Sequence, residues 1–248
     1  MKEELFVFLS QLSPTWKELP LVLYTFGLNS FSFADLEEAE RLRRQGKKVI
    51  CLWEDVWTLK NALVRKRLEG EIVGRRRIFA RSCMLRTIQK EEADLFFETT
   101  HLLGSAKAKY RYGLFYQDQL VAAAAFSGLR MIARGGEFYR SAEWVRYSSL
   151  PQLTVTGGMS RLLSAFVSEQ KPDDVMSYAN KDWSEGAAYI KLGFERVGET
   201  PLQSYWLVPD TLLRYPQKRH PIPKPHWKQV YSLGSLKFVK FFNNSFYL

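Results

Sequence analysis

Residues 155–163 read VTGGMSRLL, and residues 178–194 read YANKDWSEGAAYIKLGF. The first stretch predicts an apolar strand that passes through two glycines into a helix. The second predicts a short helix around Tyr189, after which Gly193 and Phe194 open another strand. A helix entered through glycines leaves backbone N–H groups free to hold a pyrophosphate, and a tyrosine can protonate a leaving group. These two stretches therefore carry the most specific chemistry in the chain.

The segments around these stretches predict alternating strands and helices, and therefore an α/β fold with a mixed sheet. The expected strands are 84–89, 110–116, 120–126, 138–148, 153–156, 174–179, 194–197 and 204–208. The expected helices are 91–103, 159–169 and 186–192. Residues 117–119 separate two strands and predict a hairpin turn.

With this order of elements and the Tyr-x-x-x-Gly-Phe motif at 189–194, residues 84–208 resemble the GNAT superfamily of N-acyltransferases. The resemblance covers roughly half of the chain. It implies a co-substrate, acetyl-CoA, whose pantetheine arm lies where the central strand separates from its neighbour. The pyrophosphate would then lie at the N-terminus of the helix that follows the glycines. The cofactor-binding residues implied are Thr156, Gly157, Gly158, Met159, Ser160, Arg161 and Asn180.

The resemblance also implies the two catalytic groups, and it requires no metal. Tyr189 would protonate the departing thiolate. Glu143 is the only carboxylate in the expected strand 138–148, so it would accept the amine proton directly or through water. From the sequence alone, a core aromatic residue is the less favoured alternative for Tyr189. Glu143 could face either side of its strand, and an exposed structural glutamate is an equal alternative.

The glycine loop departs from the family pattern, which has Arg or Gln, two residues, Gly, one residue, and then Gly or Ala. With Gly158 as the first glycine, Val155 stands at the head and Ser160 at the second glycine. With Gly157 in that place, the two positions hold Thr154 and Met159. Both registers stay open, and neither supplies the Arg or Gln. A glycine pair before a helix is also typical of an ordinary tight turn.

Residues 1–76 predict a small helix–strand–helix unit, with helices at 33–45 and 56–68 and a strand at 48–53. Ser32 is the expected N-cap of the first helix, and Gly46 is expected to end it. Gly70 and Gly74 are expected to break the chain within a charged connection at 71–77.

Residues 35–77 resemble the back half of the Vsr-like endonuclease domain of some phage homing endonucleases. The matching residues are Gly46, Val49, Ile50, Trp53, Glu54, Asp55 and Trp57. Glu54 and Asp55 are adjacent, so they are better placed to cap the next helix than to share a metal. The segment before residue 35 has few carboxylates and no histidine. We therefore interpret the whole front unit as a truncated remnant that does not cleave DNA, with contact to nucleic acid left open.

The net charge of +10 is clustered in two places. The first cluster contains Arg75, Arg76, Arg77, Arg81, Arg86 and Lys90, and the second contains Lys218, Arg219, Lys224, Lys228, Lys237 and Lys240. Such clusters fit the phosphates of nucleic acid or of coenzyme A, or they form a solvated basic surface. The second cluster lies in an aromatic C-terminal extension, 216–248, that we expect to form a hairpin or an edge strand. The predicted domains are 1–76, 77–215 and 216–248.

No apolar run reaches the length of a membrane span, and the first residues do not form a secretory signal. Cys51 and Cys83 do not suggest a disulfide framework. We therefore expect a cytoplasmic protein. The leading hypothesis is an acyl-CoA-dependent N-acyltransferase acting on an amine. The alternatives are a non-catalytic nucleic-acid-binding accessory protein of phage or mobile-element origin and an acyl-CoA sensor without turnover.

Overall fold

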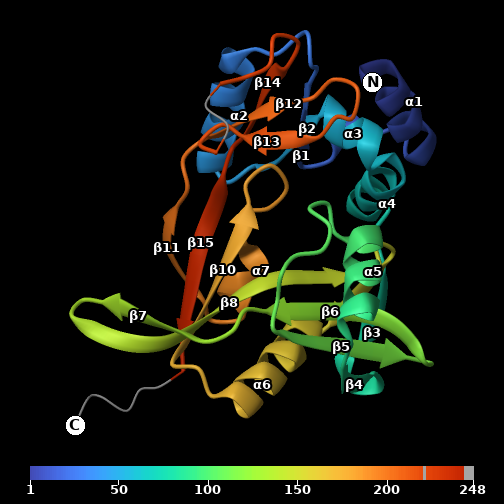
Figure 1. The fold of residues 1–248 in the computed structure, drawn as a ribbon. Helices are drawn as coiled ribbons and strands as arrows, with labels where there is room; N and C mark the ends of the chain where they lie inside the picture. The colour runs from blue at the N-terminus through green and yellow to red at the C-terminus, as the bar shows by residue number, and fades with distance from the viewer. Residues whose placement is uncertain (220–221, 243–248) are drawn as a thin grey trace. The chain divides into compact units, whose positions relative to one another are not determined.

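The computed structural model describes residues 1–219 and 222–242 (Figure 1). Within these residues the chain forms two compact units, each built from separate segments. The first unit contains Met1–Val64, Ala179–Ala187 and Gly198–Lys237. The second contains Arg65–Tyr178, Ala188–Val197 and the chain from Phe238 onward. The predicted division into three consecutive domains stays a prediction.

The first unit contains two small sheets and several helices. Strands β1 (Leu21–Phe26) and β2 (Lys48–Trp53) are parallel, and β12 (Gln203–Leu207) pairs in antiparallel fashion with β13 (Arg214–Pro216) and β14 (Lys228–Ser232). The helices are α1 (Lys2–Leu12), α2 (Phe33–Arg44), α3 (Glu54–Leu59) and the first residues of α4 (Asn61–Ile72), with a 3-10 turn η1 (Trp16–Glu18).

The predictions for residues 32–53 are confirmed. Helix α2 begins directly after Ser32 and stops before Gly46, which adopts a φ of +79° that favours glycine. Strand β2 has the predicted bounds. The predicted single helix 56–68 is instead two helices that meet at Lys60. The predicted break at Gly70 is wrong, because α4 continues through it to Ile72.

A buried ion pair fixes the start of α3 against the antiparallel sheet. Arg214 donates from Nε and Nη2 to the two carboxylate oxygens of Asp55, at 2.5 and 2.8 Å. The Asp55 side chain is 2% exposed, and Arg214 also donates to the carbonyl of Tyr231. Glu54 accepts the backbone N–H of Leu28. Both acids thus lie in the first turn of α3, but the predicted capping role is wrong, because their carboxylates bind Leu28 and Arg214 and not the helix N-terminus.

We predict that Asp55→Asn destabilises the protein by about 3 kcal/mol, the lower end of the range for breaking a buried pair, because it leaves the partly buried Arg214 without its counter-charge. Glu38→Gln is the matched control, since Glu38 pairs with Arg41 at the exposed surface and its loss should change stability little. Denaturant unfolding of both variants measures the difference. Equal, small losses for the two variants would contradict the prediction.

The second unit contains most of an eight-stranded mixed sheet, which confirms the predicted α/β fold class. The strand order is β11-β15-β10-β8-β6-β5-β4, and β7 pairs with β8. The strands are β4 (Met84–Thr87), β5 (Tyr110–Tyr116), β6 (Gln119–Phe126), β7 (Arg130–Arg134), β8 (Glu137–Ser149), β10 (Asp174–Asn180), β11 (Glu195–Glu199) and β15 (Ser235–Phe241). Strand β10 is parallel to β8, and β4, β5, β6 and β7 pair in antiparallel fashion with their neighbours.

Helices cover both faces of this sheet. Helix α5 (Lys90–Thr100) packs its phenylalanines against Ala123 and Ala125 of β6. Helix α6 (Gly158–Gln170) covers the other face, where Phe166 stacks on Phe126 with ring centroids 4.0 Å apart. The short helix α7 (Ala187–Lys191) also contributes to this second face. We call the two sides the α5 face and the α6 face.

Three parts of this unit differ from the predictions. Residues 76–79, expected as a connection, form β3 (Arg76–Phe79), which runs parallel to β9 (Leu153–Thr156) and precedes the turn η2 (Ala80–Ser82). Strand β7 was not expected. The expected C-terminal hairpin or edge strand is wrong, because β14 and β15 belong to different sheets and β15 lies between β10 and β11. Phe238 and Val239 of β15 are buried, which explains why an aromatic extension becomes an interior strand.

Candidate functional site

The central strands β8 and β10 pair over only four residues. Their parallel register runs from Ser141 opposite Asp174 to Trp144 opposite Ser177. Both strands continue beyond this point, but no further backbone pair between them occurs in the described structure. On its other side β8 has an irregularity, because Phe126 is opposite Trp144 whereas Ala125 is opposite Arg146. Val145 is therefore an extra residue, a β-bulge at the point where the two strands part.

The bulge determines which face each side chain occupies. Trp144 stacks on Phe126, with ring centroids 5.2 Å apart, so it lies on the α6 face. Glu143 precedes it and, by strand alternation, lies on the α5 face. Arg146 is opposite Ala125 and also lies on the α5 face. Tyr147 returns to the α6 face, where its ring is 5.9 Å from that of Trp144.

Tyr189 lies on the α6 face at the parting of the strands. Its hydroxyl is hydrogen-bonded to Ser177 Oγ at 2.8 Å, and Ser177 Oγ also donates to the carbonyl of Trp144 at 2.9 Å. Its ring packs against Phe194 and Phe238. Burial raises the pKa of Tyr189 above its usual value, so the hydroxyl stays protonated at neutral pH. Tyr189 is thus packed like a core aromatic residue and also presents a protonated hydroxyl at the branch point.

The N-terminus of α6 opens on a pocket of about 530 Å³. Its lining residues are Phe79, Ala80, Arg81, Thr156, Gly157, Ser160 and Arg161. Gly157 is the N-cap with a φ of +78°, and no side chain caps the helix. A Cβ on Gly158 would lie 3.1 Å from Val155 and 3.3 Å from the hydroxyl of Tyr147. The first glycine therefore supplies a left-handed conformation, and the second allows close packing.

The predicted cofactor residues divide into two groups. Thr156, Gly157, Ser160 and Arg161 line the pocket, and Gly158 and Met159 begin the helix beside it. Arg161 also holds the edge of the pocket, because its Nη1 donates to the carbonyls of Ala80 and Cys83. Asn180 does not line this pocket. Its Oδ1 accepts the backbone N–H of Asp182, which stabilises the turn after β10.

A second pocket of about 410 Å³ lies along α6, beginning at its N-terminal turn. Ser160 lines both pockets. Lys191 and Lys240 line the second pocket, and Lys240 also donates to the carbonyl of Leu192. Lys240 belongs to the C-terminal strand β15. The sequence identified it only as part of a basic cluster, because nothing local indicates that the strand returns to this helix.

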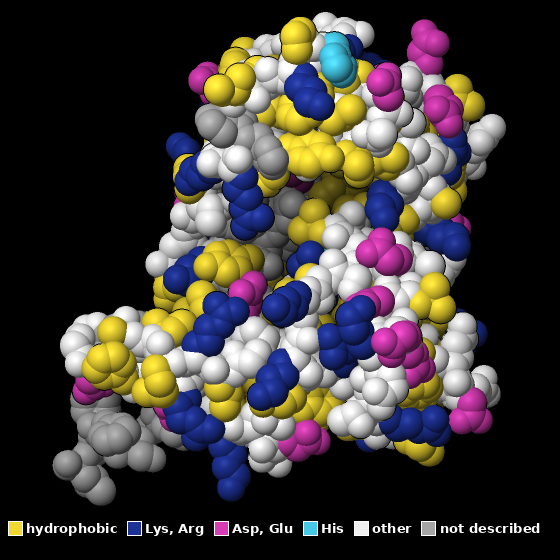
Figure 2. Space-filling view, in the orientation of Figure 1, with side chains coloured by type: hydrophobic (Ala, Val, Ile, Leu, Met, Phe, Trp, Pro, Cys, Tyr) yellow, Lys and Arg dark blue, Asp and Glu magenta, His cyan; other side chains and the backbone are white. Residues whose placement is uncertain are grey.

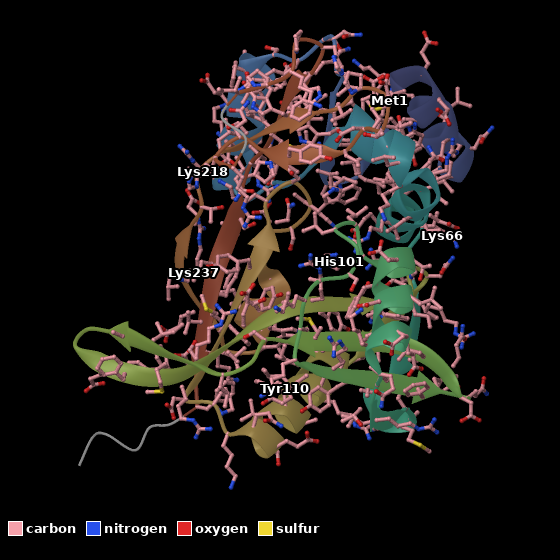
Figure 3. All side chains as sticks on the ribbon, in the orientation of Figure 1. Met1, Lys66, His101, Tyr110, Lys218 and Lys237 are labelled. Carbon is pink, nitrogen blue, oxygen red and sulfur yellow. The ribbon has the colours of Figure 1, made fainter. Side chains whose placement is uncertain are left out.

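Sequence reasoning missed Arg146, Tyr147 and His101. The bulge determines the positions of Arg146 and Tyr147, and no pattern in the sequence predicts this bulge. His101 lies on the loop that follows α5 (Figure 3). Its Nδ1 accepts the backbone N–H of Leu103 at 3.1 Å. Burial, together with the charges of Arg146 and Arg67, lowers the pKa of His101 to about 3, so the ring is neutral at physiological pH.

Acidic partners compensate part of the first basic cluster. Arg75 pairs with Glu71 and Lys90 with Asp94, each four residues away in the sequence. Arg86 is 3.5 Å from Asp118, whereas Arg76 and Arg77 are exposed on β3. On the face drawn in Figure 2, Lys and Arg side chains are interspersed with Asp and Glu. The basic residues therefore do not form one continuous surface there.

Among residues 1–219 and 222–242, no group of three or more His, Cys, Asp or Glu side chains is placed to hold a metal ion. No helix in the same residues is long and apolar enough to cross a membrane.

No protein-family model matches the sequence, and no curated protein matches it. Solved structures give distant matches. Eis1 from Mycobacterium abscessus is 18% identical with a TM-score of 0.40, and the match covers 50% of this chain and 33% of Eis1. A GNAT family acetyltransferase from Elizabethkingia anophelis with acetyl-CoA bound is 10% identical, with a TM-score of 0.39. This match covers 65% of this chain and 99% of the acetyltransferase. The putative acetyltransferase yncA from Salmonella typhimurium, with its cofactor acetyl-CoA, is 13% identical, with a TM-score of 0.39. This match covers 67% of this chain and 97% of yncA.

These matches are too distant to establish a shared family or activity for this chain. The chain spans 33% of the length of Eis1.

We predict that His101 remains neutral until the pH falls far below 6.5, the usual pKa of histidine. The folded-state pKa of about 3 is lower than the unfolded one, so His101 contributes stability above pH 6.5 that is lost as the pH falls towards 3. An NMR titration of the ring protons checks the pKa. His101→Gln should lose less stability than the wild type between pH 7 and pH 4, and an equal loss would contradict the assignment.

Proposed function

We propose that the chain is an acyl-CoA-dependent N-acyltransferase of the GNAT superfamily that transfers an acetyl group from acetyl-CoA to an amine. One observation carries the proposal: β8 and β10 part at Trp144 and Ser177, with a protonated tyrosine at the branch point. Beyond the branch β8 and β10 no longer pair with each other in the described structure, and the carbonyls of Val145 and Arg146 accept side-chain hydrogen bonds. The remaining backbone groups on these strand edges would offer partners to the amides of a pantetheine arm, because strand N–H and C=O groups need hydrogen bonds.

The pocket at the start of α6 suits the pyrophosphate of acetyl-CoA. The N–H groups of the first helical turn have no side-chain cap, and the helix dipole favours an anion there. Arg81 lines the same pocket and adds positive charge. The second pocket shares Ser160 and contains Lys191 and Lys240, so further phosphate or nucleotide groups of the co-substrate would bind there.

The proposed reaction is a direct attack within a ternary complex. The amine nitrogen attacks the thioester carbonyl, and Glu143, directly or through water, takes the proton that the nitrogen loses. The carbon–sulfur bond then breaks, and Tyr189 gives its proton to the thiolate. Ser177 Oγ reaches both the Tyr189 hydroxyl and the carbonyl of Trp144, so its proton can turn towards the tyrosinate as this forms. No metal takes part in these steps.

Glu143 and Tyr189 lie on opposite faces of the sheet, which suits their separate roles. The amine would approach from the α5 face, where Glu143 lies, and coenzyme A would occupy the α6 face, where the helix N-terminus and Tyr189 lie. Proton acceptance and proton donation then occur on different sides of the reacting carbon. The alternative function, nucleic-acid binding without turnover, is less favoured, because Arg75, Arg86 and Lys90 of the first basic cluster pair with acids.

We predict that Ser160→Glu abolishes acetyl-CoA binding in a calorimetric titration, because it adds a negative charge where the pyrophosphate would lie. The change suits the helix itself, since an acid in the first turn complements the helix dipole. It is a cleaner test than a change at Gly158, whose Cβ would crowd Val155. Gln89→Glu is the matched control and should bind normally, because Gln89 is exposed at the N-terminus of α5 and lines neither pocket. Undiminished binding by Ser160→Glu would exclude this site.

We predict that Tyr189→Phe lowers kcat by about 10²–10⁴-fold, the usual contribution of a general acid, while acetyl-CoA binds as before. The variant keeps the ring that packs against Phe194 and Phe238, and Ser177 can still donate to Trp144. Thiol release measured with a chromogenic reagent gives the rate. A variant with full activity would show that Tyr189 only fills the core.

A further inference from the structure

We infer that the acceptor of the proposed transferase is an amine with a carboxylate close to its amino group, and that Arg146 binds this carboxylate. The inference rests on the proposed function, since it concerns the acceptor side of the same site. Arg146 would determine specificity, because it would contact the acceptor without taking part in proton transfer.

The β-bulge places Arg146 on the acceptor side. In a regular strand, with no bulge at Val145, alternation would put Arg146 on the α6 face beside Trp144. With it, Arg146 is opposite Ala125 and shares the α5 face with Glu143. The bulge thus brings a guanidinium group next to the proposed base, at the position where β8 leaves β10.

Two hydrogen bonds hold the Arg146 guanidinium in one orientation. Nε donates to the carbonyl of Gly104 at 3.0 Å, and Nη1 donates to the carbonyl of Val145 at 2.9 Å. The described protein residues provide no partner for the third nitrogen, Nη2. The side chain is partly buried, so little conformational freedom remains to be lost when Nη2 donates to a ligand. An arginine fixed in this way is suited to a carboxylate.

The charges around Arg146 indicate a zwitterionic acceptor. Glu143 and Arg146 influence each other electrostatically but form no ion pair in the described structure, so both remain available to a ligand between them. Glu98 also acts electrostatically on Arg146, Arg67 acts on His101, and His101 itself is neutral. An α-amino acid offers an amine to Glu143 and a carboxylate to Arg146. A polyamine has no negatively charged group that could pair with Arg146 or Arg67.

The test compares free α-amino acids with their C-terminal amides as acceptors, with the full chain and saturating acetyl-CoA. The amide lacks only the negative charge, and its less basic amine is more often unprotonated at neutral pH. A preference for the acid therefore runs against intrinsic reactivity. We expect kcat/KM to favour the amino acid by about tenfold to a hundredfold, the usual effect of one charge-assisted hydrogen bond. Arg146→Gln should bring this ratio close to one, mainly by raising KM for the amino acid.

The controls separate a specificity role from a structural one. Arg130→Gln removes an exposed charge from the neighbouring strand β7 and should keep the wild-type ratio. Arg146→Lys keeps the charge and should keep part of the ratio, even if Arg146→Gln folds poorly. A wild-type ratio near one, equal losses for both acceptors in Arg146→Gln, or transfer to neither acceptor would overturn the inference. Calorimetry with acetyl-CoA distinguishes these outcomes from failure of the proposed function: binding without the acceptor preference overturns the inference alone, whereas absence of binding overturns both.

Discussion

The extra residue at Val145 is the constraint on which the candidate site depends. A regular strand would keep Trp144 and Arg146 on one face, but the bulge separates them and returns Tyr147 to the side of Trp144. Bulges also bend the strand that carries them, which agrees with the end of pairing between β8 and β10 at the same position. One inserted residue therefore accounts both for the parting of the strands and for the division of polar side chains between the two faces.

The sequence predicted the regular elements well because their signals are local. Gly46 ends α2 through its positive φ, and the turn residues Gln117 and Asp118 join β5 and β6. The sequence also identified the glycine pair before α6, and the structure shows why each position suits glycine. Gly157 adopts a left-handed backbone conformation, and Gly158 leaves space for the side chains packed against it. Local signals failed where tertiary packing decides. Gly70 lies inside α4 although glycine is a poor helix former, and residues 76–79 become a strand because β9 pairs with them.

The site itself was predicted only in part, for the same reason. Tyr189 and the residues around Gly157 belong to recognisable motifs, so the sequence located them. The sequence could not show which face of the sheet the Glu143 side chain occupies, because Ala142 and Trp144 on either side are both apolar and the partner strands were unknown. Phe238 packs against the ring of Tyr189 from the last described strand, and Lys240 reaches the second pocket from the same strand. Contacts between residues so distant in the sequence leave no pattern in a single chain.

Tyr147 connects the two halves of the candidate site. Its ring packs on Trp144 at the branch point, and its hydroxyl lies 3.3 Å from the position that a Cβ of Gly158 would occupy. A larger residue at 158 would therefore disturb the helix N-terminus and the branching strand together. Burial raises the pKa of Tyr147 well above its usual value, so this hydroxyl also remains a neutral hydrogen-bond donor. Gly158 at the start of α6 and the aromatic residues under the strands thus pack closely together, which explains why a small residue suits position 158 even though its φ is ordinary.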